Sequence, residues 1–152
     1  PDTLGPSEPL TLMEMAEPSV SFVGVGVLSA LNDGLEPKNS CDHDIPRFTW
    51  WNHLGTKEWV QYDWPEVQTL RAVQVYWFDD EPVKRHCRTP QSWRLLYKDG
   101  QEWKPVLTKD PYGTEPNKYH RVQFEPVRTT ALRIEVQLKP NWSGGILEWK
   151  VE

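Results

Sequence analysis

Apolar and polar residues alternate in several short runs along the chain, which is the pattern of half-buried β-strands. The run at residues 130–138 shows it most clearly, because Leu132, Ile134, Val136 and Leu138 alternate with charged or amide side chains. No segment has a convincing helical period. The pattern predicts about eight strands, at residues 20–23, 58–64, 69–78, 92–98, 102–107, 118–124, 130–138 and 146–151.

Turn residues separate these runs. Asp99-Gly100 lies between two alternating segments and predicts a tight hairpin, because such a turn needs positive φ. Pro65-Glu66 and Glu125-Pro126 are expected to end strands. Short strands at this spacing predict an all-β, antiparallel β-sandwich of the jelly-roll type, with the first and last strands adjacent.

The chain has 152 residues, a length that suits one domain. Residues 1–17 are rich in proline and are expected to form a linker or an N-terminal strap, and residues 18–152 to form the β domain. The first residues lack the basic start and apolar stretch of a signal peptide, and there is no initiator Met. The sequence is therefore expected to be a module of a longer protein.

The net charge of −5 comes from interspersed acidic and basic residues, and no run of Lys or Arg marks a surface that would follow a phosphate backbone. This argues against nucleic acid and anionic membranes as partners. No apolar stretch is long enough to span a bilayer.

Nine tryptophans are the most unusual feature of the composition. Most are expected in the core, and the remainder are candidate platforms for sugar rings. A long polar loop after residue 32 contains Trp50-Trp51, and loops of this length usually bind ligands. Trp142 is the strongest candidate because its loop is polar and glycine-rich, whereas only one of Trp50 and Trp51 is expected to face outward. The predicted sugar contacts are Trp50, Trp51, Tyr112 and Trp142 as aromatic groups, with His43, Asp79, Asp80 and Arg88 as polar groups.

The order of several short motifs resembles a discoidin-type (coagulation factor C-type) domain of the galactose-binding-like fold. These motifs are SALNDG at residues 29–34, EWVQYDW at 58–64, ALRIEV at 131–136 and LEW at 147–149. The resemblance covers residues 20–151. Residues 39–80 are more narrowly similar to accessory modules of bacterial β-L-arabinofuranosidase-like glycoside hydrolases.

This resemblance implies a non-catalytic carbohydrate-binding module of a secreted bacterial enzyme, extracellular or periplasmic. The module would target the glycoside hydrolase to a complex polysaccharide, such as that of plant cell walls. Its partners would be an oligo- or polysaccharide and the parent catalytic domain. The alternative is a structural module that packs against the catalytic domain and binds no glycan. Adhesion to lipids or proteins is disfavoured because the chain lacks a set of basic, apolar-tipped loops.

The resemblance also implies a structural calcium ion held by Asp33 and Glu148, since calcium takes six to eight oxygen ligands. The alternative is that Asp33 belongs to a simple turn and Glu148 is a solvated strand residue. The segment Leu35-Glu36-Pro37 departs from the family pattern of short polar residues, which leaves the other ligands unassigned.

Catalysis by the chain itself is not expected. Asp79-Asp80-Glu81 could supply one carboxylate of a glycosidase pair, but nothing identifies the second. Cys41, His43, His53 and His86 are candidate metal ligands, but their spacing does not match a known zinc site. Cys41 and Cys87 form either a disulfide, which an extracellular compartment permits, or two free thiols.

Overall fold

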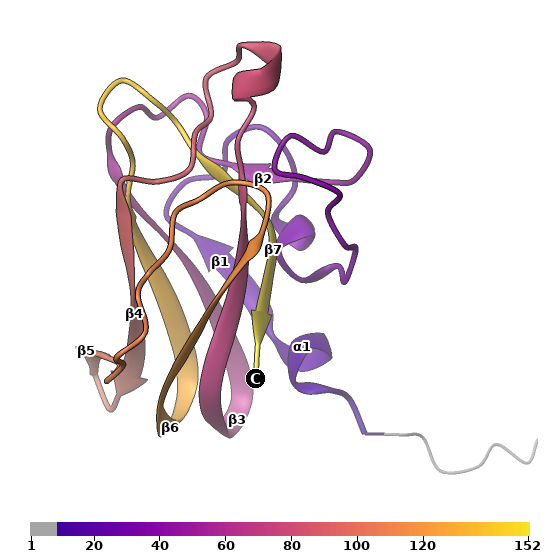
Figure 1. The fold of residues 1–152 in the computed structure, drawn as a ribbon. Helices are drawn as coiled ribbons and strands as arrows, with labels where there is room; N and C mark the ends of the chain where they lie inside the picture. The colour runs from indigo at the N-terminus through magenta and orange to yellow at the C-terminus, as the bar shows by residue number, and fades with distance from the viewer. Residues whose placement is uncertain (1–8) are drawn as a thin grey trace, which may run out of the picture.

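The computed structural model describes residues 9–152, which form an antiparallel β-sandwich (Figure 1). One short helix, α1 (Leu12–Met15), precedes the strands, and two 3-10 turns, η1 (Leu28–Asn32) and η2 (Glu81–Val83), lie between them. The strands are β1 (Glu17–Val20), β2 (Phe48–Thr49), β3 (Lys57–Phe78), β4 (Ser92–Asp99), β5 (Glu102–Pro105), β6 (Tyr119–Gln137) and β7 (Gly145–Val151).

Two long strands, β3 and β6, contribute to both layers of the sandwich. Their first pairing segment, residues 57–63 against 131–137, is flanked by β1 on one side and by β4 and β5 on the other. Their second segment, residues 68–76 against 119–129, continues into β7 and β2. All seven strands therefore belong to one hydrogen-bonded sheet that folds over itself, and the predicted all-β sandwich is confirmed.

The fold-over occurs where the sequence predicted strand ends. The pairing of β3 with β6 shifts register between Asp63 and Gln68 and again between Leu70 and Ala72. Pro65 and Pro126 lie in these interruptions, where a residue without an N–H does not break the ladder. The prolines therefore bend two continuous strands instead of ending four short ones.

Other sequence predictions have mixed outcomes. The Asp99-Gly100 hairpin is confirmed, with Gly100 at φ +64° and β4 paired to β5. The predicted strand at residues 20–23 lies earlier, at β1, and β2 was missed because two residues cannot show a period. β1 pairs with β3 and not with β7, so the predicted adjacency of the first and last strands is wrong.

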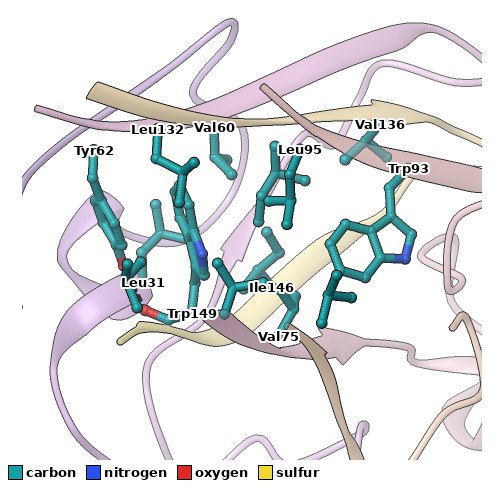
Figure 2. Packing of buried hydrophobic residues seen from close by; sticks show 14 of the residues in the cluster. Leu31, Val60, Tyr62, Val75, Trp93, Leu95, Leu132, Val136, Ile146 and Trp149 are labelled. Atoms are coloured by element: carbon teal, nitrogen blue, oxygen red, sulfur yellow. Dashed lines mark hydrogen bonds between the residues drawn. The ribbon is translucent and has the colours of Figure 1, made fainter. Parts of the chain in front are cut away.

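The core lies between the two layers (Figure 2). Tyr62 stacks on Trp149 with ring centroids 3.9 Å apart, and its hydroxyl donates to the Trp149 carbonyl at 2.8 Å. The alternating residues of β6 are buried as predicted, with Leu132, Ile134 and Val136 all without exposed surface. Burying each such side chain contributes roughly 1.5–3 kcal/mol, and this fixes the scaffold that positions the loops.

The described part of the N-terminal segment is a strap across the domain. Helix α1 has a capping box between Thr11 and Glu14. The indole of Trp64 donates to the Leu12 carbonyl at 2.8 Å, and the Asn32 amide donates to the carbonyls of Met13 and Ala16. The rest of the predicted linker, residues 1–8, lies outside the described residues. From residue 9 onward, the chain contains no helix with the length and apolar character that crossing a membrane requires.

Candidate functional site

Three loops that are distant in the sequence meet at one end of the sandwich, which is called the loop end here (upper part of Figure 1). The Arg88 amide donates to the Ser143 carbonyl at 3.0 Å, and the Ser143 amide donates to the His86 carbonyl at 2.8 Å. The Gly55 amide donates to the Trp142 carbonyl at 2.9 Å. These bonds connect the loop after β2, the loop after β3 and the loop before β7.

Two glycines allow a fourth segment, residues 24–27, to form a wall at this end. Gly24 donates to the Thr49 carbonyl at 2.9 Å, and the Thr49 amide donates to the Val25 carbonyl at 3.1 Å. Gly26 has φ +107°, and a Cβ there would lie 2.0 Å from the Arg47 carbonyl oxygen. Only glycine permits this approach, which places the wall directly beside Arg47.

A cleft of about 750 Å³ opens at the loop end, and we refer to it as the cleft. Its most prominent aromatic group is the half-buried Trp51, which stacks nearly parallel on His86 with centroids 4.5 Å apart. His43 lies edge-on to Phe78 at 5.7 Å. The lining residues are Val25, His43, Arg47, Thr49, Trp51, Phe78, Asp80, Val83, Arg85, His86 and Cys87.

The polar groups of the cleft are mainly basic. Arg47 lies with its guanidinium carbon 5.3 Å from the centre of the Phe78 ring. Neither Arg47 nor Arg85 makes a side-chain hydrogen bond or a salt bridge within residues 9–152. Asp80 is the one lining carboxylate, and it is 7% exposed. It accepts from the Cys87 amide at 2.8 Å and lies 3.6 Å from Arg88, so it is already engaged.

Asp79 stabilises the loop after β3. Its carboxylate accepts from the amides of Glu81 and Thr89, each at 3.0 Å, and the residue is 7% exposed. Both of its oxygens bind the backbone of its own loop, and a role of Asp79 as a sugar contact stays a prediction. Asp80 has a similar role, although it also reaches the cleft wall.

Adjacent tryptophans have opposite environments. Trp50 has no exposed surface and packs edge-on to Phe48 at 5.2 Å, so it belongs to the core. The expectation that only one of the pair faces outward is correct, and that residue is Trp51. The half-buried Tyr112 packs its ring on Trp93 at 4.8 Å and accepts from the Leu95 amide through its hydroxyl, and its sugar-binding role stays a prediction.

Trp142 lies at the loop end but not in the cleft lining. The Arg88 guanidinium lies 3.9 Å from the centre of its ring and covers one indole face. Arg88 itself donates to the carbonyls of Arg85 and Cys87, each at 2.8 Å, and its side chain is 12% exposed. The two residues form a packed pair, and a sugar-binding role for either stays a prediction.

Solved structures of other proteins share this architecture, although no sequence comparison finds a match. No protein-family model matches the sequence, and no curated protein matches it. A chain of the Streptococcus pneumoniae beta-galactosidase BgaA is similar in structure, with a TM-score of 0.71, 19% identity and coverage of 95% of this chain and 96% of that one. The family 32 CBM of C. perfringens NanJ, solved with galactose, has a TM-score of 0.67 at 11% identity, covering 91% and 94%. A pectin-binding carbohydrate-binding module has a TM-score of 0.57 at 18% identity, covering 91% and 90%.

The chain has the galactose-binding-like fold of carbohydrate-binding modules. The resemblance seen in the sequence is thus confirmed for the fold.

Sequence reasoning missed several cleft residues of this carbohydrate-binding-module fold. Arg47 and Phe78 are at the ends of strands that meet only in three dimensions, and no local signal marks them. Arg85 and His86 belong to the basic stretch Lys84-Arg85-His86, which was visible in the sequence. His86 was considered only as a metal ligand, and within the described chain no group of three or more His, Cys, Asp or Glu residues could hold a metal ion.

The two cysteines are free thiols in the structure. Burial raises the pKa of Cys87 to about 12, with the nearby Asp80 charge adding to the effect. Burial also raises the pKa of Cys41. Neither thiol is activated as a nucleophile, because a reactive cysteine needs a lowered pKa.

A second polar site lies away from the cleft, where the turn after η1 meets β7, and we refer to it as the Asp33–Glu148 corner. Glu148 is 2% exposed, and its Oε2 accepts from the Gly34 amide at 3.1 Å. Its Oε1 has no hydrogen-bond partner among residues 9–152. Burial, and then the adjacent Asp33 carboxyl, raise the pKa of Glu148 to about 9. The alternative of a solvated strand residue is therefore wrong for Glu148.

Proposed function

We propose that this chain is a non-catalytic carbohydrate-binding module whose sugar site is the cleft. The observation that supports this most directly is Trp51, a partly exposed indole held in a fixed orientation by stacking on His86. Sugar rings need such a platform together with a few convergent polar groups. The cleft supplies both, and its volume of about 750 Å³ falls within the range of ligand sites.

The biological setting extends this proposal. The module would belong to a secreted bacterial glycoside hydrolase and hold that enzyme near a complex polysaccharide, for example of the plant cell wall. Binding at one shallow site is weak, but attachment to the enzyme raises the effective concentration of substrate around the catalytic domain. Structures of the same fold with galactose or pectin named as ligands support this direction.

Affinity electrophoresis of the isolated chain in gels containing different polysaccharides tests the proposal. Retardation is expected in at least one gel, and Trp51→Ala should abolish it. Trp103→Ala is the matched control, because Trp103 is equally half-buried but lies in β5, outside the cleft. Both variants should remain folded, and Trp103→Ala should unfold at a somewhat lower temperature because it loses one cation–π contact with Arg133.

Two results would contradict the assignment. Retardation that survives Trp51→Ala would place the sugar elsewhere on the chain. No retardation in any gel, for a folded protein, would favour the alternative of a structural module packed against its catalytic domain.

We propose in addition that Asp33 and Glu148 are ligands of a structural calcium ion. A second buried carboxylate, that of Glu58, shows by comparison what Glu148 lacks. Glu58 is 4% exposed, but it accepts hydrogen bonds from Ser21, Thr56 and His53 at 2.6, 2.6 and 2.7 Å. Glu148 has no comparable set of donors and faces another carboxyl group. Oxygen groups of this kind suit a hard cation, with backbone carbonyls and water completing the coordination.

A further inference from the structure

We infer that the cleft binds an anionic sugar residue, in which a carboxylate or a sulfate is bound by Arg47 and Arg85 while the ring lies against Trp51. This inference rests on the proposed function, because it names the chemical class of ligand for the same cleft. The general assignment requires only that some glycan binds there. The argument for the class comes from the charges and hydrogen bonds of the lining residues.

Arg47 is the clearest indication of an anionic ligand. Three arginines are half-buried within residues 9–152, namely Arg47, Arg88 and Arg133. Arg88 donates to two backbone carbonyls, and Arg133 donates twice to the Gln61 side chain. Arg47 has no such acceptor among the described residues, although its guanidinium is held beside Phe78. A guanidinium has five N–H donors, and those of Arg47 face the cleft without an acceptor from residues 9–152. They are therefore free to bind a ligand oxygen.

The remaining charges of the cleft do not neutralise Arg47. Arg85, His43 and His86 add basic groups to the same lining, and Asp80 is the one carboxylate. Asp80 is already used by the Cys87 amide and by Arg88. The balance therefore favours a negative ligand group over a neutral hydroxyl or an amine.

This basic character is local. The whole chain has a net charge of −5, so it repels polyanions from most of its surface. A general affinity for acidic polymers is not expected. Binding of an anionic glycan would therefore depend on the cleft itself.

The geometry of arginine suits this role better than a single point charge does. The planar guanidinium pairs with two oxygens of a carboxylate or a sulfate at once, which fixes orientation as well as charge. Trp51 lines the same cleft and offers an apolar surface to a sugar ring. An anionic sugar could therefore make a charge-paired contact and a stacking contact at the same time.

Calorimetric titration with matched ligand pairs tests the inference, in buffer without added calcium because calcium also bridges uronates. The first pair is oligogalacturonate and its methyl ester, in which a neutral methyl ester replaces each carboxylate charge. The second pair is dextran sulfate and dextran. A panel of neutral galactan and arabinan oligosaccharides tests the general proposal separately.

We expect one charged ligand to bind at least roughly tenfold more tightly than its neutral partner, which is the effect of one charge-assisted pair. Arg47→Gln should remove most of this difference. Arg128→Gln is the matched control, because Arg128 is exposed, pairs with Thr69 in the second β3–β6 segment and does not line the cleft. It removes the same charge and should change affinity less than about twofold.

The outcomes separate the two proposals. Tighter binding of oligogalacturonate identifies the carboxylate as the recognised group, and tighter binding of dextran sulfate identifies the sulfate. Equal binding within both pairs, or binding of neutral oligosaccharides alone that is abolished by Trp51→Ala, overturns the inference and keeps the general assignment. Equal losses for Arg47→Gln and Arg128→Gln also overturn it. No binding of any ligand overturns both.

Discussion

The cleft and the Asp33–Glu148 corner show opposite kinds of incomplete hydrogen bonding. In the cleft, Arg47 is a half-buried donor without an acceptor. In the corner, Glu148 Oε1 is a buried acceptor without a donor. Buried polar groups in folded proteins are nearly always paired, and this applies to Glu148 Oε1, whereas the Arg47 guanidinium reaches solvent in the cleft. The contrast underlies the two proposals, an anionic ligand for the cleft and a cation for the corner.

The outer face of the sheet shows the same residue types with no deficit. There the Arg133 guanidinium lies 4.2 Å from the centre of the Trp59 ring and 4.3 Å from that of Trp103. It donates to Gln61 Oε1 at 2.9 and 2.6 Å. Because these contacts satisfy Arg133, this cluster stabilises the fold and offers little to a ligand. Exposed tryptophan beside arginine is therefore not sufficient evidence of a binding site.

The largest expected effect concerns the corner. Calcium at about 100 times its dissociation constant should stabilise the folded chain by about 2.7 kcal/mol. For a chain of this length this corresponds to a rise in unfolding temperature of roughly 5–10 °C. Differential scanning calorimetry with calcium or with EDTA measures it.

The Glu148→Gln variant separates a specific site from a general salt effect. The substitution keeps the shape of the side chain but removes a charged ligand, so the calcium-dependent shift should disappear. Glu66→Gln, at an exposed position in β3, should keep it. An unfolding temperature that calcium leaves unchanged in the original chain would remove calcium from the corner.

Sequence alone predicted the scaffold better than the site, and the reason is physical. Alternation along residues 130–138 depends on one strand and its burial, and the Asp99-Gly100 turn depends on local backbone geometry. Both are local properties. Extended geometry also predicted that only one of Trp50 and Trp51 faces outward, but which one does so depends on packing against distant β7.

The site residues were recognised because their side chains lack hydrogen-bond partners, and no local sequence pattern shows such a lack. Arg47 matters because no acceptor from β3 or the loop after it reaches its guanidinium. Glu148 lies between Leu147 and Trp149, which are both buried because β7 is covered on both faces. Alternation of apolar and polar residues therefore does not show that Glu148 is buried. The family resemblance identified Glu148, but its missing donor became visible only in three dimensions.

The second prediction compares the two arginines directly. Arg133→Ala should destabilise the chain by about 2 kcal/mol, because it removes two hydrogen bonds and two cation–π contacts. Arg47→Ala should cost only about 0.5–1 kcal/mol, since it removes one cation–π contact with Phe78 and no hydrogen bond or salt bridge. Urea unfolding monitored by tryptophan fluorescence measures both. A loss of similar size for the two variants would show that Arg47 is structural, and the contrast between cleft and outer face would fail.

The third prediction follows from the raised pKa of Glu148, about 9 against an ordinary value of 4.5. A carboxyl whose pKa is higher in the folded state contributes stability that is fully present below pH 4.5 and is lost as the pH rises towards 9. In EDTA, the original chain should lose at least about 1.4 kcal/mol relative to Glu148→Gln over this interval. Parallel pH profiles for the two proteins would mean that Glu148 is ionised in the metal-free fold.

The smallest expected effect is the salt dependence of ligand binding. Sodium chloride largely screens exposed charges that lie further apart than about 10 Å at 0.1 M and about 3 Å at 1 M. The affinity of the cleft for its anionic ligand should therefore fall about threefold between low and high salt, because Arg85 is exposed and Arg47 only half-buried. Arg47→Gln should flatten this dependence, whereas Arg128→Gln should leave its slope unchanged. Equal slopes for all three proteins would mean that the guanidinium groups of the cleft do not contact the ligand charge, and the contrast with the satisfied Arg133 would then have no functional meaning.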